Sequence, residues 1–147
     1  RTVVVKDGLL CGYLYDTYTA AKEGRASTGN AVRGSFRSMP TVGTTNFYLE
    51  PGAASPEELV AGVGEGLYVT EVMGMHTANP ISGDFSVGAA GVWIKDGAFA
   101  YPVRGVVIAG NMLELLRQVD AVATDLRFFG GRGAPTFRVA ALGVSGE

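Results

Sequence analysis

The stretch Gly91-Val-Trp-Ile-Lys-Asp-Gly-Ala-Phe-Ala-Tyr101 places an Asp-Gly pair between two apolar runs. Asp-Gly favours a type I′ turn, because both central residues of that turn need a positive φ, and such a turn joins neighbouring antiparallel strands. The same arrangement occurs at Asp7-Gly8, between residues 2–6 and 9–15. Two such hairpins predict mainly antiparallel pairing. Pro102 is expected to end the second strand of the Asp96-Gly97 hairpin or to lie on a sheet edge, because proline donates no hydrogen bond to a ladder.

Three helices are predicted beside these strands. Asp16 is placed to cap a short helix that runs to Lys22 and ends at Gly24. The run Ser-Pro-Glu-Glu at residues 55–58 combines a cap, a proline at the first helical position and a glutamate three residues after the cap. Asn111 repeats the pattern and precedes an apolar stripe at helical spacing, formed by Met112, Leu115, Leu116, Val119 and Val122.

Four further runs read as strands, and the whole predicts an α+β fold. They span residues 46–50, 67–73, 106–109 and 137–142. We therefore expect a mainly antiparallel sheet or a barrel-like β domain with two or three flanking helices. Residues 1–147 contain no internal repeat and no linker, which favours a single domain.

The composition supports a folded, turn-rich chain. Glycine contributes 22 of 147 residues, about 15% against an average of about 7%. The net charge is −2 and the pI is about 5.4, whereas nucleic-acid binding usually needs a basic face. The single cysteine, Cys11, permits no intramolecular disulfide and is expected to be buried in a strand. No apolar run reaches the roughly 18–20 residues of a membrane helix.

The sequence offers few residues that are suited to catalysis. His76 is the only histidine, so this chain alone cannot build a site with two histidine ligands. The sequence has neither a Gly-x-Ser-x-Gly elbow nor a phosphate-binding Gly-x-x-x-x-Gly-Lys loop. We assign no catalytic residue and no metal ligand. Arg33 and Arg37 fall in a segment without acidic residues. One interpretation is that they clamp an anionic group, since arginine presents a planar set of donors. The favoured interpretation is that they lie on a solvated loop.

A series of short motifs follows one order along most of the chain. The motifs are residues 12–20, 27–31, Pro40 with 45–46, 49–52, 55–59, 66–71, 82–86, 91–94, 102–103 and 108–111. In order and spacing they resemble the C-terminal domain of the PmbA/TldD metallopeptidase family, also described as modulators of DNA gyrase. The resemblance implies that residues 1–147 are one domain of a longer protein.

Within that family the chain resembles the PmbA branch, also called TldE, at residues 69–74 and 82–86. The TldD branch carries a His-Glu-x-x-x-His zinc motif upstream, completed by a cysteine from the C-terminal domain. This chain has no His-Glu pair, and its glycine-rich segment 129–135 has no cysteine. The resemblance therefore implies no zinc in this domain, with zinc expected only in a TldD-like partner subunit or in an upstream region.

The implied function is that of one subunit in a cytoplasmic TldD/TldE-type peptidase, paired with a TldD-like subunit or with itself and acting on peptides. Loops carrying Arg33, Arg37, Asn46, His76 and Asp84 are expected to face the peptide or the partner. Two alternatives stay open: a zinc peptidase whose metal motif lies upstream of Arg1, and a regulator of DNA gyrase. The acidic pI argues against direct nucleic-acid contact in the second.

Overall fold

The computed structural model describes residues 1–146, and the chain divides into two compact units. Unit 1 comprises residues 1–48 together with 128–133. Unit 2 comprises residues 49–127 and the segment that begins at Ala134. That the whole forms a single domain stays a prediction, and each unit is described by itself.

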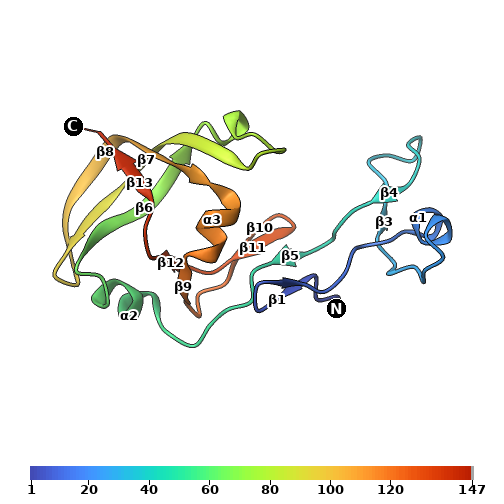
Figure 1. The fold of residues 1–147 in the computed structure, drawn as a ribbon, viewed down its shortest axis with the longest axis horizontal. Coiled ribbons are helices and arrows are strands. Elements are labelled where there is room, and N and C mark those ends of the chain that lie inside the picture. The colour runs from blue at the N-terminus through green and yellow to red at the C-terminus, as the bar shows by residue number, and fades with distance from the viewer. Residues whose placement is uncertain (147) are drawn as a thin grey trace. The chain divides into compact units, whose positions relative to one another are not determined.

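Unit 2 is built on an antiparallel four-stranded sheet with the order β13-β8-β7-β6 (Figure 1). Its strands are β6 (Glu65–Met73), β7 (Asp84–Lys95), β8 (Ala98–Asn111) and β13 (Gly143–Ser145). Asp96 and Gly97 join β7 to β8 with φ of 50° and 76°, which confirms the turn expected from Asp-Gly. The sheet is open, because β6 and β13 are its edges.

The core of unit 2 lies on one face of this sheet. Alternate residues Phe85, Val87 and Ala89 of β7 are buried against Val106 and Ile108 of β8. This spacing follows the two-residue period of a strand, which sends every second side chain to the same face. Partly buried residues from several elements complete the cluster: Leu67, Ala78, Val103, Met112, Leu115 and Leu142.

Pro102 does not end its strand, since β8 continues to Asn111. The alternative expectation, an edge position, agrees with the pairing. Pro102 lies opposite Val92 of β7, while β13 pairs with β8 only at residues 107–109. At Pro102, β8 therefore has a neighbouring strand, β7, on one side only within the described residues. On the other side no strand of residues 1–146 is there to accept a hydrogen bond, so the missing N–H of proline is tolerated.

Helix starts agree with their predicted caps. The helices are α1 (Thr17–Lys22) in unit 1, and α2 (Pro56–Ala61) and α3 (Met112–Arg117) in unit 2. Asp16 and Ser55 each form a reciprocal capping box with the residue three positions on. Asn111 caps α3 through Leu113 N, whereas Glu114 pairs with Arg117.

The third helix is shorter than the apolar stripe predicts. Val119 and Val122 lie in a strand, β9 (Val119–Val122), which pairs antiparallel with β12 (Phe137–Val139). Placing them on α3 was wrong, because β-branched valines gain from packing on a paired strand and lose χ1 freedom in a helix. The apolar pattern after Ser55 predicts a helix that ends at Gly64 or Gly66, but α2 ends earlier, at a C-cap formed by Gly62.

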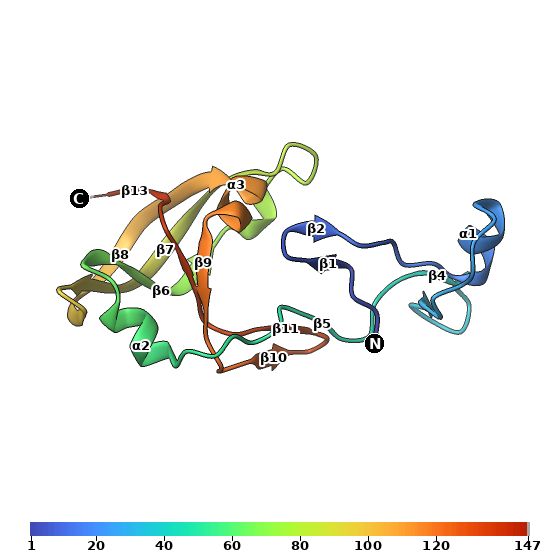
Figure 2. The same cartoon turned by 60° about the horizontal axis from the view of Figure 1, so that its bottom comes forward.

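Unit 1 contains α1 and several very short ladders. The hairpin of β1 (Val5–Lys6) and β2 (Leu9–Leu10) turns at Asp7-Gly8 with φ of 50° and 76°, as predicted (Figure 2). The pair of β3 (Ala31–Val32) and β4 (Thr41–Val42) is also antiparallel. A further sheet has the order β10-β11-β5, from β10 (Arg127–Phe129), β11 (Arg132–Ala134) and β5 (Phe47–Tyr48), where β11 and β5 are parallel.

These elements confirm the predicted α+β class with mainly antiparallel strands and three helices. The expected burial of Cys11 in a strand was wrong: its side chain is exposed and follows β2, which ends at Leu10 and whose own two residues are exposed. None of the helices within residues 1–146 has the length and apolarity to cross a membrane.

Candidate functional site

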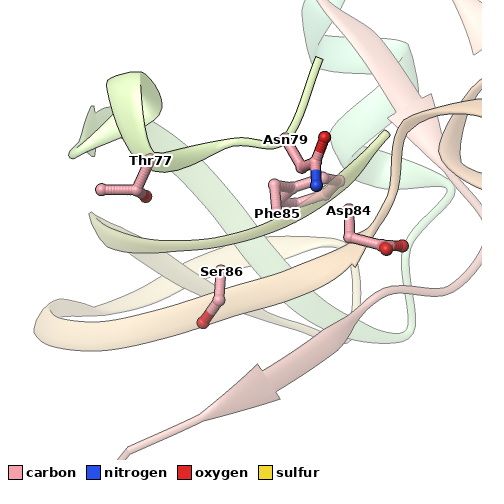
Figure 3. A pocket seen from close by; sticks show the side chains of 5 residues that line it. All are labelled: Thr77, Asn79, Asp84, Phe85 and Ser86. Atoms are coloured by element: carbon pink, nitrogen blue, oxygen red, sulfur yellow. The ribbon is translucent and has the colours of Figure 1, made fainter. Parts of the chain in front are cut away.

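A shallow pocket of about 470 Å³ lies in unit 2, where the chain passes from β6 to β7. Its lining consists of Thr77, Asn79, Asp84, Phe85 and Ser86 (Figure 3). The first residue ends the short 3-10 helix η1 (Met75–Thr77), and the last three begin β7. The pocket therefore lies between a hydrogen-bonded loop and the start of β7, a strand whose alternate residues belong to the hydrophobic core.

The loop of residues 79–84 closes on itself through its first residue. Asn79 Oδ1 accepts from the backbone N–H of Ile81 at 2.9 Å and of Ser82 at 3.2 Å. The Asn79 N–H donates to the carbonyl of Asp84, and the Asn79 carbonyl accepts from Gly83, both at 2.9 Å. Asparagine is favoured in such turns because its side chain imitates a backbone acceptor. The loop is thus held by its own backbone together with the Asn79 side chain, and it leaves the Ile81 side chain 96% exposed.

Asn111, at the end of β8, connects this loop to α3. Its amide nitrogen Nδ2 donates to the Ser82 carbonyl at 2.8 Å and to Asp84 Oδ1 at 2.9 Å. Its Oδ1 accepts from the Leu113 N–H at 3.0 Å and caps the helix. One side chain therefore fixes the loop, the carboxylate and the helix start together.

Asp84 is held as a carboxylate. The hydrogen bond from Asn111 and then that from Ser82 lower the pKa of Asp84 below its ordinary value of 3.8, against a smaller opposing effect of burial. The side chain is exposed at the pocket rim. At neutral pH it offers a fixed negative charge and acceptor oxygens, with no proton to give.

The polar side chains of the pocket do not converge on one point. Figure 3 shows the Thr77 hydroxyl, the Asp84 carboxylate and the Ser86 hydroxyl pointing in different directions. General acid–base catalysis needs a pair of groups within hydrogen-bond reach of one reacting atom. These three groups therefore do not form an acid–base pair.

The predicted site residues fall into both units. His76 lies exposed on η1, in the connection between β6 and β7, and Asp84 is the first residue of β7. In unit 1, Arg33 and Arg37 are exposed on the loop between β3 and β4, and the Arg37 guanidinium lies 5.0 Å from the centre of the Phe36 ring. Asn46 is exposed directly before β5. Their roles stay predictions.

Sequence reasoning missed Asn79 and the bridging role of Asn111. The dipeptide Asn79-Pro80 is a recognised turn signal and was available in the sequence. The Asn111 bridge was not, because it spans 27 to 29 residues of chain to reach Asp84 and Ser82.

The donor set of the domain does not by itself fit a zinc site. Across residues 1–146, His, Cys, Asp and Glu side chains form no group of three that could hold a metal ion. His76 and Cys11, the two residue types most typical of zinc ligands, are both exposed and belong to different units.

Comparison with known proteins places the whole described chain in one family. Residues 1–146 match the family described as PmbA/TldA metallopeptidase C-terminal domain. Metalloprotease PmbA of Escherichia coli O157:H7 is 36% identical over 126 residues, which is 86% of this chain and 26% of that protein. A metalloprotease TldD homolog of Haemophilus influenzae is 31% identical over 122 residues, 82% of this chain and 25% of that protein.

Solved structures agree with these matches. A Thermotoga maritima protein named as a candidate modulator of a DNA gyrase is 40% identical with a TM-score of 0.85, covering 97% of this chain and 32% of that one. TldE from Thermococcus kodakarensis is 28% identical with a TM-score of 0.87, covering 97% of this chain and 33% of that one. The chain thus spans about a quarter to a third of the proteins that it matches.

Proposed function

The chain belongs to the PmbA/TldD metallopeptidase family as its C-terminal domain, and from this membership we propose that it comes from a PmbA/TldE-like subunit. In this proposal the subunit pairs with a TldD-like subunit, or with itself, in a cytoplasmic complex that acts on peptides. The domain serves assembly or confinement of the peptide, and zinc is held by the TldD-like subunit.

One observation carries the proposal. The family match covers residues 1–146, yet the chain holds one histidine and one cysteine. Zinc catalysis in proteins uses three protein ligands and an open position for water. Since His, Cys, Asp and Glu side chains of residues 1–146 also form no group of three that could hold a metal ion, the proposal assigns zinc ligation to another region or another subunit.

The exposed surface of unit 1 supports a role in assembly. Large apolar side chains stand in solvent there, with Phe36 and Met39 both 82% exposed beside Arg33 and Arg37. Exposed apolar groups rimmed by polar ones are typical of interaction surfaces. The loops with Asn46, His76 and Asp84 are also exposed, as a peptide-facing or partner-facing role requires.

The test uses the full-length parent protein, alone and co-expressed with a TldD-like subunit. We expect a stable complex by analytical ultracentrifugation, zinc in the complex, and hydrolysis of unfolded peptides only when the TldD-like subunit is present. Replacing Arg33 and Arg37 with alanine should weaken the complex, while Arg104→Ala, a matched surface arginine of β8, should not.

The same experiment separates the alternatives. Zinc binding and hydrolysis by the parent alone would favour a zinc peptidase with its motif upstream. The name of the Thermotoga maritima relative favours a DNA gyrase regulator as second candidate. A change in gyrase supercoiling activity on adding the parent, without zinc-dependent hydrolysis, would support that candidate.

A further inference from the structure

Two hairpin turns of the chain have the same Asp-Gly sequence but different surroundings. Lys6-Asp7-Gly8 and Lys95-Asp96-Gly97 are the same tripeptide. Their Asp and Gly residues have the same positive φ, 50° and 76° in both turns. Any difference in reactivity between the two sites therefore comes from what surrounds each turn, since local sequence and turn type are matched.

We propose that Asp7-Gly8 is a site of spontaneous isomerisation to isoaspartate, and that Asp96-Gly97 is protected from the same reaction by its hydrogen bonds. In this reaction the Gly nitrogen attacks Cγ of the Asp carboxyl group. A C–N bond forms, the carboxyl C–OH bond breaks, and one water leaves with the amide proton. Water then opens the succinimide at either carbonyl, and attack at the α-carbonyl gives isoaspartate with no net change in mass.

The Gly nitrogen is free in one turn and engaged in the other. Gly97 N–H donates to the Val63 carbonyl at 2.9 Å, and Asp96 N–H donates to the Gly64 carbonyl at 2.6 Å. Within residues 1–146, no hydrogen bond holds the Gly8 N–H. The nucleophile of the reaction is therefore available at Gly8 and occupied at Gly97.

The space around the two glycines also differs, and it is open at Gly8 and occupied at Gly97. A Cβ at Gly97 would come within 2.8 Å of the Ala61 carbonyl oxygen at the end of α2. At Gly8 nothing lies within 4 Å of that position. The Asp7 turn stands in open space, whereas the Asp96 turn is packed against a helix.

Opening of the turn is also easier at Asp7. Ring closure rotates the Asp-Gly peptide out of its turn geometry, so the hairpin must open locally first. The β1–β2 ladder has two residue pairs, and a hairpin this short is marginally stable in water. The β7–β8 ladder extends from Lys95 and Ala98 to Asp84 and Asn111, so local opening at Asp96 works against a long sheet.

The test follows both sites in the full-length protein, incubated at neutral pH in water enriched in oxygen-18. Peptide mapping by mass spectrometry reports label uptake and isoaspartate at each site. We expect isoaspartate to accumulate at Asp7 about tenfold faster than at Asp96, the ratio given by ~1.4 kcal/mol of difference in opening free energy. In urea-unfolded protein the two rates should become nearly equal, because each aspartate lies between the same lysine and glycine neighbours.

A pair of variants gives a second readout. Asp7→Asn and Asp96→Asn both keep a residue that type I′ turns favour, so both should fold. At asparagine, formation of the succinimide releases ammonia, and water then opens the ring to aspartate or isoaspartate, which changes the mass. In the native state the Asp7→Asn variant should deamidate faster than the Asp96→Asn variant. In the unfolded state the two variants should deamidate at nearly the same rate. Equal native rates at the two positions, or a faster rate at Asp96, would overturn the proposal.

Discussion

Asn111 is the residue whose side chain does most to shape the candidate site. It donates to the Ser82 carbonyl and the Asp84 carboxylate and accepts from the Leu113 N–H. Asn111→Ala should lower the free energy of unfolding by about 1–3 kcal/mol, since it removes a helix cap and leaves polar partners unmatched. Urea unfolding followed by circular dichroism measures the loss.

Asn111→Asp is the matched control for this prediction. It keeps the acceptor that caps α3 but replaces the amide donor with a second carboxylate beside Asp84. We expect destabilisation at neutral pH that diminishes in acid, when the two carboxyl groups share protons. A loss that is the same at every pH would contradict the bridging role of the amide.

Several carboxyl groups should make the protein acid-sensitive. Hydrogen bonds from Thr19 lower the pKa of Asp16, and a hydrogen bond from Asn111 lowers that of Asp84. Hydrogen bonds from Arg138 and Thr136 do the same for Asp120 and Asp125.

A carboxyl group with a lowered folded pKa contributes stability above its unfolded pKa and loses it as pH falls through the folded one. Stability should therefore stay level at mildly acidic pH and decline as pH falls below the ordinary value of 3.8. Urea midpoints measured from pH 7 to pH 2 test this. The Asp84→Asn variant should show a shallower decline, and an unchanged midpoint across the range would be inconsistent with these pairs.

At the scale of elements, two glycines of β7 should respond oppositely to alanine. A Cβ at Gly91 would overlap the Tyr68 carbonyl oxygen of β6 and lie 3.1 Å from Val69 Cα. Gly91→Ala should destabilise the protein by about 1–3 kcal/mol, because backbone must move. At Gly88 the nearest atoms belong to Met73 at 3.6 Å, an ordinary contact.

Gly88→Ala is therefore the control, and it should be neutral or stabilising by about 0.5–1 kcal/mol, as expected for removing a strand glycine. Both variants are compared by thermal and urea unfolding. Equal effects at the two positions would mean that the close approach of β6 and β7 at Gly91 does not constrain the sheet.

At this scale, the features that could be predicted from the sequence are those fixed by interactions between residues close together along the chain. The Asp96-Gly97 turn and the Ser55 cap follow from local requirements, a positive φ and an orphan N–H, so both were predictable. Val119 was misplaced because its strand is fixed by a partner, Val139, that local periodicity does not reveal. The site followed the same rule: Asp84 was named from its motif, whereas its bridge to Asn111 depends on the β7–β8 register.

For the whole molecule, the unequal cores of the two units predict unequal protection from hydrogen exchange. In unit 1 the buried residues are Tyr15, Asp16 and Ala20, all at or near α1, and the β1–β2 and β3–β4 ladders have two residue pairs each. Unit 2 has a contiguous apolar core under a long antiparallel sheet. Amides of unit 1 should open locally at low free energy and exchange far sooner than those of β7 and β8.

Exchange measured by mass spectrometry on the full-length protein tests this, and adding the TldD-like subunit extends it to the proposed function. If unit 1 is an assembly surface, its amides should gain protection in the complex while those of β7 and β8 change little. The control is the Arg33→Ala, Arg37→Ala double variant, which should lose that gain. Slow exchange throughout unit 1 in the isolated protein would show that its short ladders are held by contacts already present, and no gain on complex formation would locate the partner elsewhere.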